Sequence, residues 1–241
     1  MNMKKVIVSI AMAFAGLFAT TSANAAVLYS DNFEAAGAAG AVNLDAPWEM
    51  NKKVYTSSGA YLNGYYPGST FGPNAILTGE GGANQGTYQG KLYPDFGYAP
   101  SWANNQVVKT SLLYNRLLTA EDIAPGEIRM DFDFKTPAIG PNASVVAFAA
   151  LLNSDFSQTW YTQTINLNSA DWTSGSSWLT FNGTQVGANA QFGFIVTSSN
   201  YEAATLIVDN IVIASVPEPS VASLLGFGVL GLVANRFRRR S

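Results

Sequence analysis

The 241-residue chain contains no cysteine and no histidine, and only 12% of its residues are charged. The lack of cysteine excludes disulfides, thiolate metal sites and a cysteine nucleophile. The lack of histidine excludes zinc hydrolase sites of the usual kind and a Ser-His-Asp triad. Any catalysis would therefore depend on carboxylates, tyrosines or lysines.

Basic residues are scarce in the middle of the chain. Six of the 13 Lys and Arg residues lie within about 25 residues of either end, but only one of the 16 Asp and Glu residues does. Seven basic and 15 acidic residues remain between the ends, which gives a net charge near −8 and no basic stripe. This balance predicts no nucleic-acid partner.

The N-terminus has the three parts of a secretory signal peptide in their usual order. Lys4 and Lys5 precede an uncharged stretch at 6–19, and the small residues Ala23 and Ala25 follow it. The pattern predicts a signal peptide at 1–25 that signal peptidase removes after Ala25. The alternative is an uncleaved membrane anchor, for which the apolar stretch is short.

The C-terminus repeats this arrangement in reverse. Pro217, Glu218 and Pro219 precede an apolar run at 221–234, which would rise about 21 Å as a helix. The run is followed by Arg236, Arg238, Arg239 and Arg240. Snorkelling arginines would bring the segment close to a workable membrane span, and their charge predicts a cytoplasmic C-terminus.

These three elements together resemble the PEP-CTERM sorting signal of Gram-negative bacteria, here at 216–241. The resemblance implies recognition by an exosortase, a membrane-embedded transpeptidase-like enzyme that processes the chain near Pro-Glu-Pro. It implies an intermediate in the inner membrane and then a place at the cell surface or in the extracellular matrix, in bacteria that make exopolysaccharide. The alternative is a plain tail anchor.

The remaining segment, 26–215, is long enough for one domain with a substantial core. Its short apolar runs, separated by Gly, Asn, Ser and Pro, predict an all-β fold: a single antiparallel β-sandwich of jelly-roll type. The clearest alternation runs from Ile128 to Lys135, with apolar residues on one face. The expected strands are 26–33, 53–55, 75–78, 86–93, 107–118, 126–136, 144–152, 160–167, 179–181, 191–197 and 205–214.

The segment from Tyr55 to Trp102 is rich in Gly, Asn, Pro and Tyr, which predicts long surface loops. Tyrosine and tryptophan rings suit sugar rings, because their faces pack on C–H groups and their polar tips bind hydroxyls. The residues expected to bind a ligand are Tyr65, Tyr66, Tyr98 and Trp102. Alternatively, these rings cover the edge of the core. Four tryptophans are expected in or beside the core, namely Trp48, Trp160, Trp172 and Trp178.

The last expected strand is apolar on both faces, yet it contains Asp209 and Asn210. Strict alternation places Asp209 on the face of Ile207 and Ile211, so a polar side chain must point toward an apolar layer. A buried carboxylate is costly unless it is paired, hydrogen-bonded or bound to a cation. The opening segment 31–34 can supply further oxygens.

Three short motifs, Asn32-Phe33-Glu34, Trp172-Thr173 and 208–211, resemble carbohydrate-binding jelly-rolls of the galactose-binding-like class. The resemblance implies a structural Ca²⁺ held by Glu34 and Asp209, with backbone carbonyls completing six to eight oxygens. This chain has one Asp in the closing motif where the class usually has two. The alternative for these residues is backbone hydrogen bonding at a strand end.

Taken together, the sequence predicts a non-catalytic surface or matrix protein that binds polysaccharide. A structural or adhesive protein without sugar affinity is the first alternative. A polysaccharide-cleaving enzyme is the second, because glycosidases use two carboxylates about 5 to 10 Å apart. No spacing motif joins any two of the available carboxylates, which are Glu80, Glu121, Asp122, Asp131, Asp133 and Asp155. No catalytic residue is therefore assigned.

Overall fold

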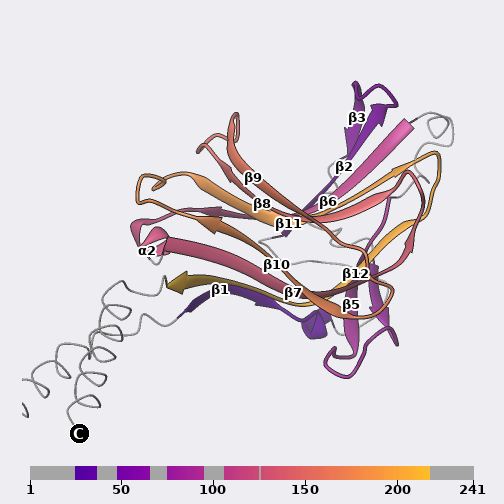
Figure 1. Cartoon of the computed structure of the whole chain (residues 1–241), viewed down its shortest axis with the longest axis horizontal. Coiled ribbons are helices and arrows are strands. Elements are labelled where there is room, and N and C mark those ends of the chain that lie inside the picture. The colour runs from indigo at the N-terminus through magenta and orange to yellow at the C-terminus, as the bar shows by residue number, and fades with distance from the viewer. Residues whose placement is uncertain (1–24, 37–47, 66–74, 95–105, 125, 218–241) are drawn as a thin grey trace, which may run out of the picture.

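The computed structural model describes residues 25–36, 48–65, 75–94, 106–124 and 126–217. These residues form two antiparallel sheets that pack face to face (Figure 1), which confirms the predicted β-sandwich. Sheet A contains β1 (Ala26–Asp31), β4 (Ala75–Thr78), β5 (Tyr88–Leu92), β7 (Gly126–Ile139), β10 (Thr173–Thr180) and β12 (Ala204–Pro217). Sheet B contains β2 (Trp48–Thr56), β3 (Tyr61–Tyr65), β6 (Gln106–Leu117), β8 (Ser144–Leu152), β9 (Thr159–Asn166) and β11 (Asn189–Ser199).

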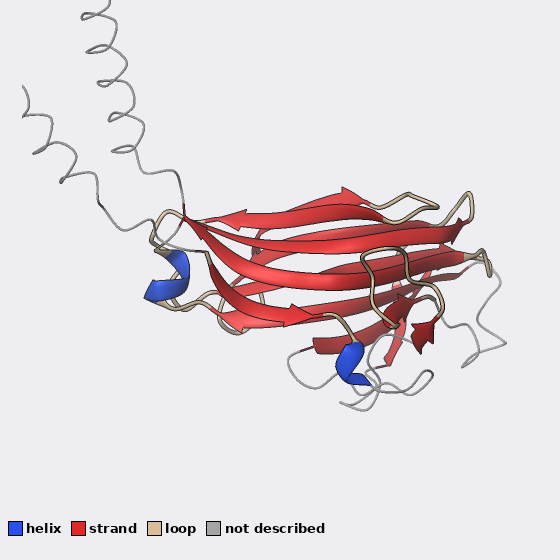
Figure 2. Cartoon of the chain, turned by 90° about the horizontal axis from the view of Figure 1, so that it is seen from below, coloured by secondary structure: helices blue, strands red, loops and turns tan. Residues whose placement is uncertain are grey.

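The chain crosses repeatedly from one sheet to the other. Sheet A has the order β10-β7-β12-β5-β4, with β1 also pairing with β12, and sheet B has the order β3-β2-β6-β11-β8-β9. Most neighbouring strands are therefore distant in sequence, as is typical of jelly-roll sandwiches. Two short helical segments, η1 (Glu34–Ala36) and α2 (Ala120–Ile123), lie outside the sheets (Figure 2).

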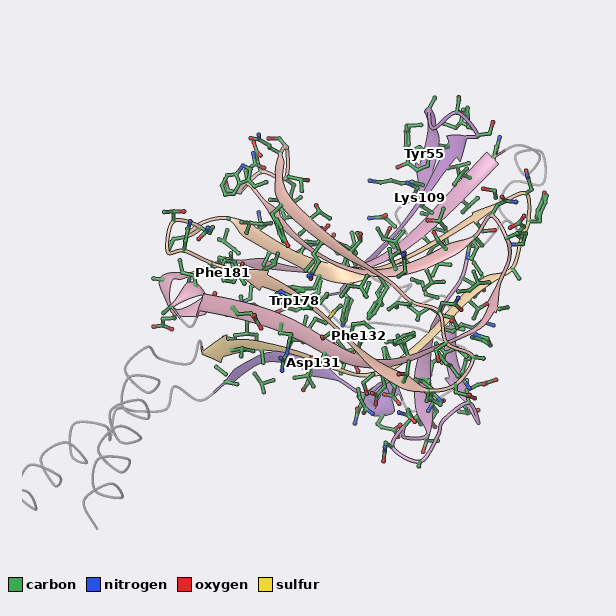
Figure 3. All side chains as sticks on the ribbon, in the orientation of Figure 1. Tyr55, Lys109, Asp131, Phe132, Trp178 and Phe181 are labelled. Atoms are coloured by element: carbon green, nitrogen blue, oxygen red, sulfur yellow. The ribbon has the colours of Figure 1, made fainter. Side chains whose placement is uncertain are left out.

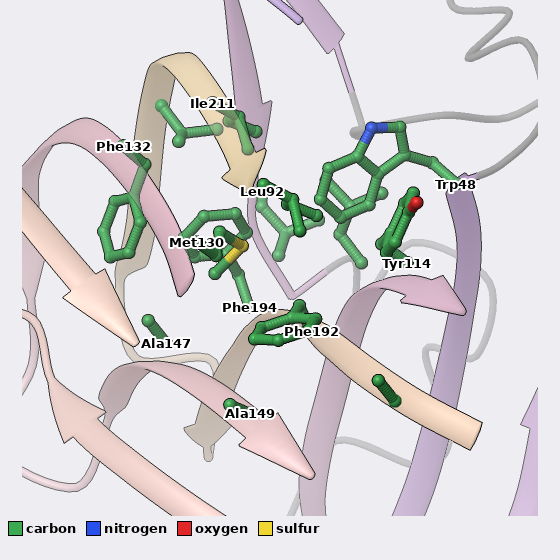
Figure 4. Packing of buried hydrophobic residues seen from close by; sticks show 14 of the residues in the cluster. Trp48, Leu92, Tyr114, Met130, Phe132, Ala147, Ala149, Phe192, Phe194 and Ile211 are labelled. Carbon is green, nitrogen blue, oxygen red and sulfur yellow. The ribbon is translucent and has the colours of Figure 1, made fainter. Parts of the chain in front are cut away.

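The core lies between the sheets and follows the alternation read from the sequence. In β7, Ile128, Met130, Phe132 and Phe134 are all buried, whereas the residues between them are partly exposed. Phe192 and Phe194 of β11 meet them from sheet B (Figure 4), and the Phe132 and Phe194 rings pack edge to face at 4.9 Å. Such fully buried aromatic side chains dominate the packing energy of a core.

Three strands differ from the sequence prediction by five residues or more. β2 begins at Trp48 rather than at Lys53, β3 was not predicted, and β10 begins at Thr173 rather than at Leu179. β3 and β10 are poor in β-branched apolar residues, and each lies at the edge of its sheet. Pairing with a regular neighbour, β2 or β7, therefore defines them more than their own composition does.

The tryptophans divide between core and surface. Trp48 is buried, as predicted, and Trp172 is half-buried with its Nε1 donating to the Glu80 carbonyl at 2.8 Å. Trp160 and Trp178, expected in or beside the core, are 51% and 37% exposed and so are not core residues. They lie on β9 and β10, the edge strands, where the facing sheet does not cover them.

The first and last strands pair antiparallel, with Ala26 opposite Ser215. The Ala26 backbone N donates to the Ser215 Oγ at 3.2 Å, and Pro217 ends β12 opposite Gly126. The expected cleavage point after Ala25 and the start of the Pro-Glu-Pro motif therefore lie at the same end of the sandwich. Ala23, Glu218, Pro219 and the four C-terminal arginines lie outside the described residues. Within the described ranges, no helix has the length and apolar character needed to cross a membrane.

Candidate functional site

Asp209 lies at a gap in the pairing of β12. On one side of this strand, β5 pairs with residues 206–208 and β1 pairs with residues 211–215. The register with β7 also shifts between Asp209 and Val212, which marks a β-bulge. Asn210 has a φ of 49°, a left-handed conformation that asparagine tolerates better than most residues. Asp209 and Asn210 therefore occupy a break between two partner strands.

The bulge changes which side chains face the core. Leu206 and Val208 belong to the core cluster, and so do Ile211 and Ile213. Strict alternation would place Ile211 on the face of Asp209, so that part of the sequence prediction was wrong. The extra residue of the bulge reverses the alternation and turns Asp209 away from the core. Asp209 is nevertheless 0% exposed.

The structure brings Glu34 and Asp209 together, as the sequence predicts for a shared site. Glu34 follows β1 and accepts a hydrogen bond at Oε1 from the backbone N of Tyr88, at 2.8 Å. A Cβ added to Gly86 would overlap Glu34 Oε1 and come within 2.7 Å of its Cδ. The Gly86 backbone also hydrogen-bonds to Asp209. The segment entering β5 therefore contacts both carboxylates.

Asp209 is only half satisfied. One carboxylate oxygen, Oδ1, accepts from the backbone N of Asn210 at 2.7 Å, but the buried Oδ2 has no hydrogen-bond partner. Burial raises the pKa of Asp209 to about 6, and the charges of Glu34 and Asp133 add to the rise against the backbone hydrogen bonds. Within the described residues neither Asp209 nor Glu34 forms an ion pair. A cation would supply the partner that the protein leaves out.

The donor set is one that calcium accepts. The two carboxylates offer hard oxygen donors, the kind that calcium binds. The part of the chain that the structure describes contains no group of three or more His, Cys, Asp and Glu side chains suited to a metal. An ion here would therefore need carbonyl or water oxygens in addition to Glu34 and Asp209.

Asp133 of β7 lies opposite Asp209 and accepts three hydrogen bonds. Asn210 Nδ2 and Gln85 Nε2 donate to its Oδ2 at 2.9 and 3.0 Å, and Ser174 Oγ donates to its Oδ1 at 2.7 Å. Burial works to raise its pKa, but these hydrogen bonds bring the pKa below its usual value. The carboxylate of Asp133 therefore joins β7, β10 and β12 around the bulge.

Three other carboxylates weighed as catalytic candidates have basic partners. Asp131 pairs with Arg129 at 3.0 Å, Glu80 with Lys135 at 2.7 Å, and Asp122 with Arg116 at 2.7 Å. Asp122 also accepts from the backbone N of Thr119 and so caps α2. Each of these groups thus has a structural role in the fold.

A groove of about 310 Å³ crosses the outward face of sheet B, away from the core. It runs over β2, β6, β11, β8 and β9, between the β2-β3 hairpin and β9 in Figure 1. Its floor is apolar: Leu113, Phe148, Ala150 and Leu152 are buried and pack with Ile195 in a cluster separate from the main core. Outward faces of antiparallel sheets are usually polar, so an apolar floor here marks a candidate binding surface.

Tyr55 forms an aromatic wall of this groove. Tyr61, on β3, is not one of the lining residues but packs edge to face on Tyr55 with ring centroids 5.9 Å apart. The Tyr61 ring lies across Gly64, where an added Cβ would come 2.6 Å from the tyrosine hydroxyl. Tyr61 is still 58% exposed, so it offers an open ring surface. Lys109 Nζ sits 5.0 Å from the Tyr55 ring centroid, and Figure 3 shows this pair on β6 and β2.

Polar groups line the rest of the groove. The rim includes an amide, hydroxyls and an ammonium group from Lys53, Thr162, Thr164 and Gln191, whereas Asn51 and Ser111 are buried beside the apolar cluster. The Gln191 side chain is oriented by a hydrogen bond from its Nε2 to Asn115 Oδ1, at 2.8 Å. An apolar floor, an aromatic wall and convergent polar groups are the usual composition of a ligand site.

Sequence reasoning missed this groove, because its residues come from five strands that only the fold brings together. One signal was present. The segment Ser144–Leu152 is apolar on both faces, although it belongs to an antiparallel sandwich with one solvent-facing side. The ligand residues that were predicted, Tyr66, Tyr98 and Trp102, lie outside the described residues, as does the side chain of Tyr65. Their role stays a prediction.

A second cleft of about 430 Å³ opens between the edge strands β9 and β10. Leu151 and Leu179 line its depth, and the exposed rings of Trp160 and Tyr161 lie at its mouth. Aromatic rings thus meet solvent beside a hollow here as well.

The sequence matches no protein-family model and no curated protein. The fold is similar to several solved structures. One is a family 11 carbohydrate-binding module of a cellulosomal cellulase of Clostridium thermocellum, with 16% identity over 83% of this chain and 99% of that chain and a TM-score of 0.40. Another is the CBM22-2 xylan-binding domain from Paenibacillus barcinonensis, with 11% identity over 78% and 99% of the two chains and a TM-score of 0.38.

A third similar structure is the N-terminal part of a Clostridium thermocellum endo-1,4-β-D-xylanase, complexed with xylohexaose. The identity is 15% and the TM-score 0.41, over 79% of this chain. The chain spans only 28% of that structure's length. All three TM-scores are below 0.5, so these likenesses do not assign a ligand to this chain.

Proposed function

We propose that this protein is an exported, non-catalytic polysaccharide-binding protein whose ligand lies in the groove of sheet B. The groove carries the proposal: an apolar floor beside Tyr55 and the exposed ring of Tyr61, on a sheet face where solvent-facing polar residues are expected. Pyranose rings pack their C–H faces on such surfaces, and their hydroxyls bind amides and hydroxyls like those of the rim. A groove that crosses five strands suits an extended chain of sugars.

We further propose a structural calcium ion at Glu34 and Asp209. The unpartnered Oδ2 of a fully buried Asp209 supports this role, because a buried carboxylate without a partner is costly. Bound calcium would connect the end of β1, the start of β5 and the bulge of β12. It would stabilise the fold at a distance from the groove and take no part in sugar contacts.

The export route belongs to the same proposal. Signal peptidase would release Ala26 as the first residue, and an exosortase would process the tail near Pro217, Glu218 and Pro219. The pairing of Ala26 with Ser215 supports this route, because the two expected processing points then lie at the same end of the sandwich. The protein would pass through the inner membrane before it reaches the cell surface or extracellular matrix.

Replacing Tyr61 with Ala is expected to weaken polysaccharide binding without lowering the melting temperature. An aromatic contact contributes about 0.5 to 1.5 kcal/mol beyond buried area, so affinity should fall roughly 2- to 12-fold. The ring is 58% exposed, so its removal leaves no cavity in the core. Isothermal calorimetry against a panel of soluble polysaccharides, with a thermal melt of each variant, measures both effects.

Trp160→Ala is the matched control for this experiment. Trp160 is similarly exposed but lies in the β9-β10 cleft. Loss of binding in Trp160→Ala alone would move the site to that cleft. A parent protein that binds no member of the panel would favour a structural or adhesive protein without sugar affinity.

Replacing both Pro217 and Pro219 with Ala is expected to leave a full-length species in the inner membrane. An exosortase would no longer recognise the altered motif, whereas a plain tail anchor does not depend on these prolines. Membrane fractionation and mass spectrometry of the C-terminus distinguish the two. The same distribution for wild type and double variant would contradict processing at this motif.

A further inference from the structure

Two lysines face each other directly in the groove. Lys53 of β2 and Lys109 of β6 are opposite partners in the antiparallel pairing, and both line the groove. Like charges directly opposite one another destabilise a sheet. Lysines are often placed on edge strands to prevent aggregation, but β2 and β6 are both interior strands of sheet B. Edge protection therefore does not account for this pair.

Within the described structure, carboxylates do not neutralise the two lysines. The six strands of sheet B contain one acidic residue, Glu49. Glu49 lies opposite Leu113, on the same face of β2 as Asn51 and Lys53 but two and four positions before them. Among the described residues Lys53 forms no ion pair, and Lys109 contacts the Tyr55 ring. Both ammonium groups are thus available to a ligand in the groove.

Charge is also divided between the two sheets. The strands of sheet A contain five carboxylates and three basic residues, whereas those of sheet B contain one carboxylate and four basic residues. This occurs in a segment whose net charge is near −8. Of the four basic residues of sheet B, Lys53 and Lys109 line the groove, whereas Arg116 is paired with Asp122.

We propose that the groove binds an acidic polysaccharide, with Lys53 and Lys109 contacting the carboxylates of uronic acid residues. This inference rests on the proposed function and specifies its ligand class. Tyr61 and Tyr55 would contact sugar rings while the two lysines contact the charged groups. A negative ligand removes the repulsion between the lysines, which explains why the pair stands unneutralised in the described structure. The net negative charge of the domain disfavours nucleic acid, whose phosphates are far more densely spaced.

The test compares acidic polymers with their neutral counterparts. The purified full-length protein is titrated with polygalacturonate, alginate and hyaluronate, and with the carboxyl-reduced form of each. Xylan and mixed-linkage β-glucan serve as neutral polymers, and single-stranded DNA as another polyanion. We expect binding to at least one uronate polymer, at least tenfold weaker binding to its reduced form, and loss of affinity as salt rises from about 0.05 to 0.5 M.

Variants assign the effect to the lysines. Lys53→Gln is expected to weaken uronate binding about threefold and the Lys53→Gln/Lys109→Gln double variant about tenfold, with neutral polymers unaffected. The melting temperature of Lys53→Gln should stay the same or rise, because the substitution removes a repulsion. If Lys53 were purely structural, Lys53→Gln would instead lower the melting temperature and leave uronate binding unchanged. Lys91→Gln on β5 of sheet A is the control with the same change of charge, and it should bind like wild type.

The outcomes separate the two proposals. Equal or tighter binding of the neutral polymers overturns the acidic ligand and leaves the polysaccharide-binding groove in place. Binding of no polymer in the panel overturns both. DNA binding as tight as that of the uronate polymers, or uronate binding that survives the double variant, overturns the role of Lys53 and Lys109.

Discussion

Calcium is expected to raise the melting temperature of the wild-type protein and to have no effect on Asp209→Asn. An ion that binds only the folded state adds about 2.7 kcal/mol at 100 times its dissociation constant. For a domain of this size that is roughly 5 to 11 °C. Melts followed by circular dichroism, with calcium and with a chelator, measure the shift.

Without calcium, wild type is expected to be less stable than Asp209→Asn at neutral pH. The pKa of Asp209 is raised from 3.8 to about 6, because burial disfavours its charged form. A raised carboxylate pKa means that the folded state holds the proton more tightly than the unfolded state. The contribution of Asp209 to the free energy of unfolding is therefore fully present below about pH 4 and is lost as the pH rises through 6. At neutral pH the free energy of unfolding is lower by roughly 3 kcal/mol.

Asp209→Asn removes this cost, because asparagine is nearly isosteric and carries no charge. In chelator at pH 7 the variant should be more stable than wild type, and the difference should disappear below about pH 4. Asp171→Asn, at an exposed position, is the control and should keep the calcium shift of wild type. A wild type that melts alike with calcium and chelator would reject the ion. A wild type more stable than Asp209→Asn in chelator would show that the protein alone satisfies this carboxylate.

Much of the fold could be predicted because period-two alternation is a local signal. Ser144–Leu152 and Ala75–Thr78 have the predicted strand bounds, and β7 has the predicted buried face. The bulge at Asp209 could not be predicted, since it depends on where β5 ends and β1 begins along β12. β3 and the start of β10 depend likewise on pairing with a neighbour.

The two candidate sites were predictable to different degrees. Asp209 was recognised because a carboxylate in an apolar strand needs a partner, and Glu34 because a similar arrangement occurs in a known class of jelly-rolls. The groove depends on registry across β2, β6, β11, β8 and β9. Lys53 and Lys109 are 56 positions apart in the sequence, and nothing local to either residue indicates that they stand opposite each other.

Gly193→Ala is expected to cost about 3 kcal/mol, a fall in melting temperature of roughly 6 to 12 °C. Gly193 lies in β11 between Leu113 of β6 and Phe148 of β8. An added Cβ would overlap the carbonyl oxygen of Leu112 and come within 3.0 Å of its carbonyl carbon. These are backbone atoms of a paired strand, so no flexible side chain can move aside. The strands themselves would have to separate.

The control for this substitution is Gly183→Ala. Gly183 has a φ of 87° with open space around it, so alanine there tests backbone strain alone and should cost about 1 kcal/mol. Gly193→Ala should also weaken polysaccharide binding, because separating β6 from β11 displaces Leu113 and the groove floor. Tyr61→Ala should weaken binding without loss of stability, so the two variants distinguish the groove's floor from its wall. A Gly193→Ala protein that melts like wild type would show that β6 and β11 are not packed as closely as described.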